Sequence, residues 1–206
     1  MEPNWLKLAK QLQAISQTGL TYATDQYDIE RYQQIRIIAA NILAKNSGID
    51  ADSIVEIFTA QAGYATPKVD TRGVVFRDNK ILLVKEISDG LWTLPGGWAD
   101  IGMSPSENVT REVFEESGFE TTAKKILAII DRSKHPHTPP APFHIYKIFF
   151  LCEITGGQPT SSNETSEVDF FAEDNIPPLS ATRILPEQIK MMFEYYRDPV
   201  KPPYFD

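Results

Sequence analysis

The chain has 206 residues, of which 42% are hydrophobic and 23% are charged, and its formal net charge is −8. This composition excludes an intrinsically disordered chain, and the acidic balance argues against a nucleic-acid backbone as the main partner. Small phosphorylated ligands stay compatible with it, because a bound divalent cation reverses the local field.

The N-terminal residues lack the basic start and apolar run of a signal peptide. No apolar run approaches the ~18 residues that cross a bilayer. The single cysteine, Cys152, cannot form an internal disulfide, and it lies in the run KIFFLCEI, which predicts a buried strand. We therefore expect a cytoplasmic protein with no membrane partner.

Residues 1–64 are expected to form a small all-α N-terminal domain, because apolar residues recur at spacings of three and four. A first helix is predicted to end at Gly19, a second to run from about residue 25 to 46, and a third from 53 to 60. Such helices bury little by themselves, so we expect them to dock on the second domain, to form a homodimer or to contact substrate. The apolar stripe on the first helix consists of Trp5, Leu8, Leu12 and Ile15, and we expect it to serve packing or self-association.

Residues 68–206 are predicted to form a second, α+β domain. The runs RGVVFRD and KILLVKE flank Asp78-Asn79, which is typical of a hairpin turn. Three later runs, AKKILAIIDR, FHIYKIFFLCEI and SEVDFFA, also predict strands, and LPEQIKMMFEYYRD predicts a C-terminal helix. Strands interrupted by single helices favour a mixed sheet over an alternating parallel fold.

One charged helix lies between these strands. Ser104-Pro105-Ser106-Glu107 predicts its start and Gly118 its end. On a helix over 105–117, the carboxylates of Glu112, Glu115 and Glu116 would converge on one side. A solvated acidic face is the alternative, but Val109 and Val113 share that side, and the pair Gly96-Gly97 precedes the helix. Clustered carboxylates at a half-buried edge favour a hard cation such as Mg²⁺ or Mn²⁺.

Residues 97–119 resemble the Nudix box, G-x5-E-x7-R-E-U-x-E-E-x-G-U, where U is a bulky apolar residue. Eight of its nine defined positions are filled. The flanking strands resemble those of the Nudix α/β/α sandwich, and the resemblance covers about residues 68–198. The whole layout resembles bacterial Nudix hydrolases that act on nucleoside diphosphates linked to another moiety (X). Positions in register are Gly97, Arg111, Glu112, Val113, Glu115, Glu116, Gly118 and Phe119.

The resemblance implies a metal-dependent pyrophosphohydrolase of the ADP-ribose, CDP-choline or UDP-X type, which releases a nucleoside monophosphate and X-phosphate. It implies that Glu112 and Glu116 are the principal ligands of Mg²⁺ or Mn²⁺, that Glu115 assists, and that the Gly96 carbonyl is a further ligand. Arg111 would orient Glu112. A carboxylate beyond the box, Glu167 or alternatively Glu164, would serve as ligand or general base.

Met103 is the one departure, because it stands where the Nudix box has a glutamate that helps to position the box arginine. Its presence puts the support of Arg111 in question, but not metal binding itself. We hypothesise that Glu107 partly substitutes, since Glu107 and Arg111 are spaced as a favourable ion pair on a helix. Glu107 is also the expected capping-box residue, so the two roles compete.

Other candidate residues carry weaker signals. The histidines His135, His137 and His144 do not have the spacing of a zinc site, and their loop is a plain connection or one that contacts substrate. Trp98 follows the glycine pair and could face a ligand. Two alternative functions stay open, a hydrolase of nucleoside triphosphates or oxidised nucleotides, and a catalytically silent nucleotide-sensing module.

Overall fold

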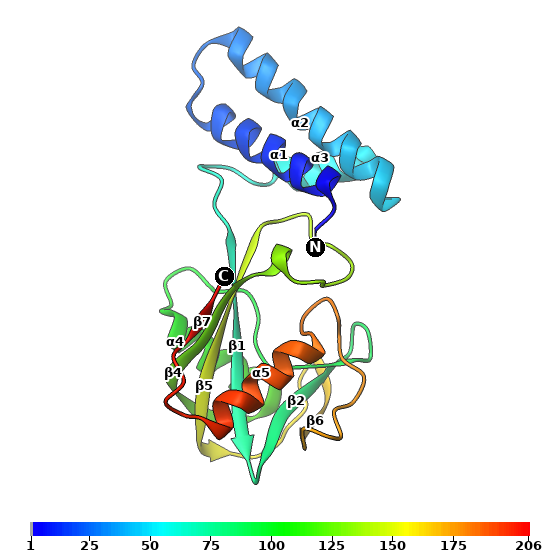
Figure 1. The fold of residues 1–206 in the computed structure, drawn as a ribbon. Coiled ribbons are helices and arrows are strands. Elements are labelled where there is room, and N and C mark those ends of the chain that lie inside the picture. The colour runs from blue at the N-terminus through cyan, green and yellow to red at the C-terminus, as the bar shows by residue number, and fades with distance from the viewer. Residues whose placement is uncertain (1) are drawn as a thin grey trace. The chain divides into compact units, whose positions relative to one another are not determined.

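The computed structural model describes residues 2–206 and contains two compact units (Figure 1). One unit comprises the chain up to Pro67 together with Ala141–His144, and the other comprises Lys68–Pro140 and Ile145–Asp206. No helix within residues 2–206 combines the length and the apolarity needed to span a membrane. The fold class is α+β, as predicted, because three helices precede a mixed sheet.

The helical unit contains α1 (Asn4–Tyr22), α2 (Gln26–Ser47) and α3 (Ala51–Thr59). The predicted limits of the second helix are confirmed: the Asp25 side chain caps α2, and Gly48 ends it in the left-handed conformation at φ 74°. The three helices share a small apolar core made of Leu6, Ala9, Ala39, Ala40, Leu43, Ile54 and Phe58.

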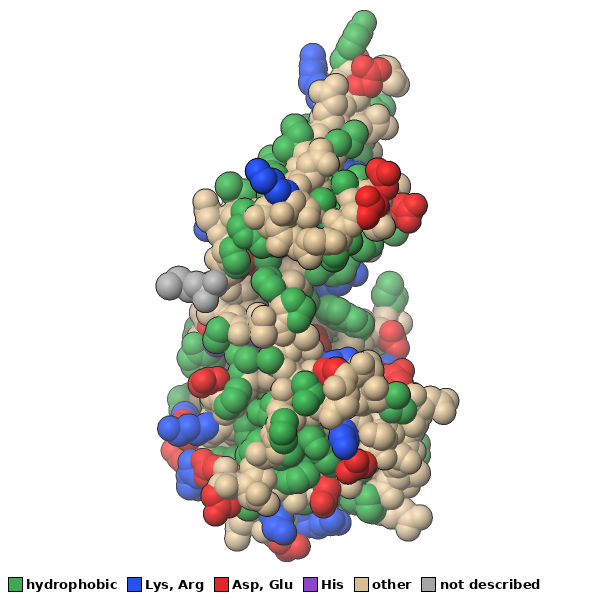
Figure 2. Space-filling model, turned by 90° about the vertical axis from the view of Figure 1, so that its right-hand side faces the viewer, with side chains coloured by type: hydrophobic (Ala, Val, Ile, Leu, Met, Phe, Trp, Pro, Cys, Tyr) green, Lys and Arg blue, Asp and Glu red, His purple; other side chains and the backbone are tan. Residues whose placement is uncertain are grey.

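The predicted end of the first helix was wrong, and its apolar stripe is only partly buried. Leu8 and Ile15 of this stripe are 46% and 54% exposed, while Leu6 and Ala9 face the core. Figure 2 shows hydrophobic side chains at the surface of the helical part. The helix also continues past Gly19, which serves close packing instead of termination: a Cβ at Gly19 would lie 2.4 Å from the ring of Tyr32 on α2.

The second unit is built on a seven-stranded sheet with the strand order β3-β2-β1-β5-β4-β7, and β6 pairs with β2. β1 and β5 run parallel, as do β4 and β7, and the other pairs are antiparallel. Asp78 and Asn79 both have positive φ, which confirms the predicted hairpin turn. The strands are β1 (Lys68–Arg77), β2 (Lys80–Glu86), β3 (Trp92–Thr93), β4 (Phe119–Asp131), β5 (Ile145–Gly157), β6 (Thr165–Phe171) and β7 (Tyr204–Phe205).

Two helices cover opposite faces of this sheet. Because side chains alternate along a strand, neighbouring residues of β1 enter different cores. Val74 packs in the core that includes α5 (Pro186–Arg197), whereas Val75 packs in the core that includes α4 (Pro105–Ser117). A short 3-10 helix, Arg132–Lys134, follows β4. The result is an α/β/α sandwich, and the charged helix α4 forms one of its outer layers.

Candidate active site

Helix α4 is fixed at both ends by the signals that predicted it. The Ser104 hydroxyl accepts a hydrogen bond from the Glu107 amide, and the Glu107 carboxylate accepts one from the Ser104 amide at 2.8 Å. Gly118 ends the helix in the left-handed conformation, at φ 76°. Val109 and Val113 are fully buried against the sheet. The helix therefore presents its carboxylates from a rigid support.

Glycines allow the loop before α4 to approach both the sheet and the helix. A Cβ at Gly96 would lie 2.0 Å from the carbonyl oxygen of Thr71 on β1. A Cβ at Gly97 would lie 2.9 Å from Oε2 of Glu112 on α4. No larger residue fits at these two positions without displacing backbone or carboxylate, so the glycine loop and the acidic helix form one site.

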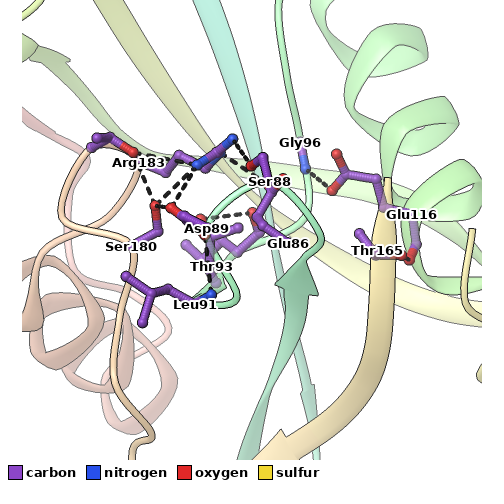
Figure 3. A network of polar contacts seen from close by, with 12 residues as sticks. Glu86, Ser88, Asp89, Leu91, Thr93, Gly96, Glu116, Thr165, Ser180 and Arg183 are labelled. Carbon is purple, nitrogen blue, oxygen red and sulfur yellow. Dashed lines mark hydrogen bonds and ion pairs between the residues drawn. The ribbon is translucent and has the colours of Figure 1, made fainter. Parts of the chain in front are cut away.

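Glu116 is the most deeply buried carboxylate of this site, at 5% exposure. Its Oε2 accepts a hydrogen bond of 2.9 Å from the Gly96 amide, as Figure 3 shows. Burial raises the pKa of Glu116 to about 8, the nearby Arg72 charge and the Gly96 amide oppose this shift, and Glu86 and Glu112 add to it. A nearby cation would favour the charged form of this buried carboxylate and so lower its raised pKa.

Arg111 holds two of the three glutamates. It donates to Oε1 of Glu112 at 2.8 Å and to Oε2 of Glu115 at 2.6 Å. The Glu112 side chain is 13% exposed, and burial raises its pKa, although the Arg111 charge opposes the shift. Glu115 is half-exposed. Glu112 and Glu116 thus form the buried part of the cluster, and Glu115 lies at its outer edge.

The hypothesis that Glu107 substitutes for a glutamate at position 103 was wrong. The Oε2 atom of Glu107 accepts hydrogen bonds from both the amide and the hydroxyl of Ser104, so the side chain is used in the helix cap. Asp100 contacts the arginine instead: its Oδ2 lies 2.7 Å from Nη2 of Arg111. Sequence spacing did not single out Asp100, because it lies in the loop and not on the helix.

A buried ionic network lies behind the carboxylates and was not anticipated. Arg72 on β1 donates two hydrogen bonds to Asp70, at 2.9 and 2.8 Å, and Lys147 on β5 donates one at 2.8 Å. Burial alone would raise the pKa of Asp70, but the two cations hold it at about 2. Burial lowers the pKa of Lys147 to about 8. Arg72 and Lys147 together carry two positive charges against the single negative charge of Asp70. The charge of Arg72 therefore also attracts the carboxylates of Glu116 and Glu86.

Glu86 is a further buried carboxylate that the sequence did not reveal. It is 7% exposed at the end of β2, and Nε of Arg183 lies 3.0 Å from its Oε1. Figure 3 shows Arg183 reaching from the loop before α5 toward Glu86, Ser88 and Asp89. Burial raises the pKa of Glu86, and Arg183 and Arg72 oppose the shift. Arg183 therefore connects the loop before α5 to Glu86 and to the turn that follows β2.

The structure does not bring Glu167 to the box carboxylates. Along β6, Phe170 packs in the core beneath α4, while Phe171 packs in the core beneath α5. Alternation places Glu167 on the α5 face, where its carboxylate pairs with Lys85 at 2.7 Å. Glu164, the alternative, lies just before the strand, and its charge raises the pKa of both Glu112 and Glu86.

The contacts of His135 and His137 are with other parts of the protein chain and not with the carboxylate cluster. His135 contacts the carboxylate of Asp206 at 3.3 Å. His137 is buried between the Ala181 carbonyl and the Gln188 side chain, and burial lowers its pKa to about 3. His144 belongs to the segment Ala141–His144 of the helical unit. Trp98 is half-exposed beside the glycine loop, and Lys68 lies 6.0 Å from its ring centroid.

The donor set of the site fits a hard divalent cation in its chemistry. Glu112 and Glu116 supply carboxylate oxygens, and burial raises the pKa of both, so a bound cation would stabilise their charged forms. Among residues 2–206, no three His, Cys, Asp or Glu side chains already converge as a metal-binding group.

Comparison with protein families covers both units. Residues 67–194 match the family described as the NUDIX domain, and residues 3–58 match the family described as "UDP-X-like, N-terminal oligomerisation domain". The match to the NUDIX domain includes the glycine loop, helix α4 and the strands that carry the buried ionic network.

Individual proteins resemble all or most of the chain. It is 46% identical over 206 residues to "Putative ADP-ribose pyrophosphatase YjhB" of Bacillus subtilis, covering 100% of this chain and 99% of that protein. A crystal structure of a UDP-X diphosphatase is 33% identical, with a TM-score of 0.64 and full coverage of both chains. An ADP-ribose pyrophosphatase from Streptococcus suis is 40% identical, with a TM-score of 0.62, and covers 68% of this chain and 100% of its own.

Proposed function

We propose that this chain, which belongs to the Nudix family, is a metal-dependent pyrophosphohydrolase that cleaves nucleoside diphosphates linked to another moiety into a nucleoside monophosphate and X-phosphate. The chain is a Nudix hydrolase similar to ADP-ribose pyrophosphatases. What the proposal adds is the metal requirement and the substrate class. The observation that carries it is the pair of carboxylates of the buried Glu116 and the largely buried Glu112, which lie against the glycine loop.

The reaction adds water to one phosphorus of the pyrophosphate and breaks one phosphoanhydride bond. Nudix hydrolases generally use divalent metal ions, which neutralise phosphate oxygens and lower the pKa of bound water. In this chain Glu112 and Glu116 would be the main ligands, with Glu115 and the Gly96 carbonyl in support. Mg²⁺ or Mn²⁺ suits such oxygen donors. Arg111 holds Glu112 in place through the 2.8 Å contact.

We assign the additional carboxylate to Glu164 in preference to Glu167. Glu164 precedes Thr165, whose hydroxyl donates to the Glu116 carbonyl at 2.7 Å. The charge of Glu164 acts on Glu112 and Glu86. Glu167 is instead paired with Lys85 on the α5 face of the sheet. A carboxylate near the ligands can accept a proton from the attacking water or complete the coordination. The Glu164→Gln variant is expected to lose turnover, and the Glu167→Gln variant to keep it.

The helical unit is proposed to form a homodimer. Its surface carries the apolar residues Leu8 and Ile15 one heptad apart on α1, and the exposed Ile37 and Ile38 on α2. The matching family is described as an oligomerisation domain, which supports this assignment. Leu8→Glu combined with Ile15→Glu should halve the mass measured by light scattering. A cytoplasmic location remains a prediction from the sequence.

The proposed reaction is tested with a substrate panel. Wild-type protein is incubated with Mg²⁺ or Mn²⁺ and ADP-ribose, CDP-choline, UDP-sugars, dinucleoside polyphosphates or nucleoside triphosphates, and the products are identified by chromatography. A nucleoside monophosphate from a diphosphate-linked substrate would support the proposal. A clear preference for triphosphates would favour a nucleotide-sanitising enzyme, and the absence of turnover on every compound would favour a silent nucleotide-sensing module.

A further inference from the structure

The loop before α4 contains a tight turn that places two positions side by side. The amide of Met103 donates to the carbonyl of Asp100 at 3.4 Å, and Gly102 has φ 90°. A type II turn requires such a positive φ at its third residue, and it brings the Cα atoms of its first and fourth residues within about 7 Å. We therefore expect a carboxylate at either the first or the fourth position of the turn to reach the same positively charged group, the guanidinium of Arg111.

The carboxylate at the first position of the turn contacts the arginine of the site. Oδ2 of Asp100 accepts from Nη2 of Arg111 at 2.7 Å, and the same Nη2 donates to Glu112 at 2.8 Å. The same nitrogen also lies 3.4 Å from Oδ1 of Asn108, and Nη1 donates to Glu115 at 2.6 Å. Asp100 therefore makes the shortest of the three contacts of Nη2, and we expect it to contribute to the position of the guanidinium group that holds Glu112.

A buried asparagine fixes the position of Asp100. The Asp100 amide donates to Oδ1 of Asn108 at 2.9 Å, and Nδ2 of Asn108 donates to the hydroxyl of Thr71 at 2.8 Å. Asn108 is fully buried in α4. Its side chain connects β1, α4 and the turn, so the Asp100 backbone is held by the rigid part of the fold although its side chain is 62% exposed.

We propose that Asp100 is a positioning residue that orients Arg111, and that it takes from the first position of the turn the role that a glutamate at position 103 would have. The proposal rests on the hydrolase function proposed above. Met103 is half-buried at the fourth position of the turn. Arg111 contacts the carboxylates of Asp100, Glu112 and Glu115, and its buried Nε atom has no hydrogen-bond partner within residues 2–206.

The proposal predicts that a carboxylate at position 103 can replace the carboxylate at position 100. Four proteins are compared with wild type: Asp100→Asn, Met103→Glu, the double variant, and Asp174→Asn as a matched control in an exposed loop. The kcat and KM are measured with the panel substrate that gives the highest kcat/KM. The Mn²⁺ concentration that gives half of the metal-induced rise in unfolding temperature is the second readout, and it needs no turnover.

Asp100→Asn is expected to lower the Mn²⁺ affinity, and with it kcat, by about 10- to 100-fold, the loss typical of residues that orient a ligand. The KM and the metal-free unfolding temperature should stay near wild type, because an exposed ion pair contributes little to stability. The double variant should recover most of the loss. An Asp100→Asn protein that matches the Asp174→Asn control in both readouts, or a double variant that recovers nothing, would overturn the proposal.

The wild-type measurement separates this proposal from the function on which it rests. If wild type turns over no substrate, the proposed function fails, and the Mn²⁺ titration still decides the role of Asp100. If wild type is active and Asp100→Asn is equally active with the same Mn²⁺ midpoint, the function stands and the role of Asp100 is refuted.

Discussion

The carboxylate of Glu116 accepts a hydrogen bond of 2.9 Å from the backbone amide of Gly96, 20 residues earlier in the sequence, and so joins helix α4 to the glycine loop. This contact defines the site, because it brings the most buried acidic group against a backbone that no larger residue could follow.

Gly97→Ala tests the close approach of the loop to α4. The added methyl group would lie 2.9 Å from Oε2 of Glu112, so the carboxylate must move. A displacement of this size is expected to lower kcat by up to about 100-fold. The unfolding temperature should change little, because the far end of a side chain can yield. Steady-state kinetics with unfolding scans on the same sample provide the check, and unchanged kcat would contradict the geometry.

Glu116→Gln tests the electrostatic state of the buried carboxylate through stability. The folded-state pKa of Glu116 is raised to about 8, above its ordinary value of 4.5, so the folded protein binds the extra proton between these values. Stability is then lost as the pH rises from about 4.5 to 8.

Without metal, the glutamine variant should therefore be more stable than wild type at pH 8, by on the order of 1 kcal/mol, and the two should converge at pH 4.5. Urea unfolding in EDTA across this range measures the difference. Parallel curves for the two proteins at all pH values would show that Glu116 is ionised in the folded state.

His137 should make the opposite contribution at lower pH. Burial lowers its pKa to about 3 from 6.5, so the unfolded chain binds a proton that the folded protein does not bind between these values. Stability should rise with pH from about 3 to 6.5. His137→Asn should reduce this rise. Unfolding free energies of the variant and wild type at pH 4 and pH 7 test it, and equal pH dependence in both would refute the buried neutral histidine.

Asp70→Asn should destabilise the fold strongly. The substitution leaves Arg72 and Lys147 buried without the carboxylate that both contact, and removal of one partner from such a network costs about 3–5 kcal/mol. Urea unfolding gives the free energy directly. The exposed Asp174→Asn serves as control, with an expected change of less than about 0.5 kcal/mol. A loss for Asp70→Asn as small as that of the control would show that the network is dispensable.

The local signals in the sequence predicted the elements that carry the site. The cap at Ser104, the stop at Gly118 and the hairpin at Asp78-Asn79 all depend on neighbouring residues, and the structure contains each of them. The mixed sheet followed from apolar runs, and the buried Cys152 from its place within one of them.

Features that depend on distant contacts were missed. Asp70 and Lys147 meet because β1 and β5 are neighbours in the sheet, 77 residues apart in sequence. Gly19 has the local sequence signal of a helix end, but its role is to allow the close packing of Tyr32, a contact that the sequence does not show. The choice between Glu164 and Glu167 depends on the start and register of β6, because a shift of one residue moves Glu167 to the other face of the sheet.

The central claim is that Glu112 and Glu116 bind the metal that hydrolysis requires. The most direct test measures turnover of the best panel substrate by wild type, Glu116→Gln and Glu167→Gln, with Mg²⁺ and with EDTA. The account predicts metal-dependent turnover in wild type and in Glu167→Gln. It predicts a loss in Glu116→Gln of more than about 100-fold, beyond that of a residue that only supports a ligand. Turnover that survives EDTA, or equal rates for Glu116→Gln and wild type, would contradict it.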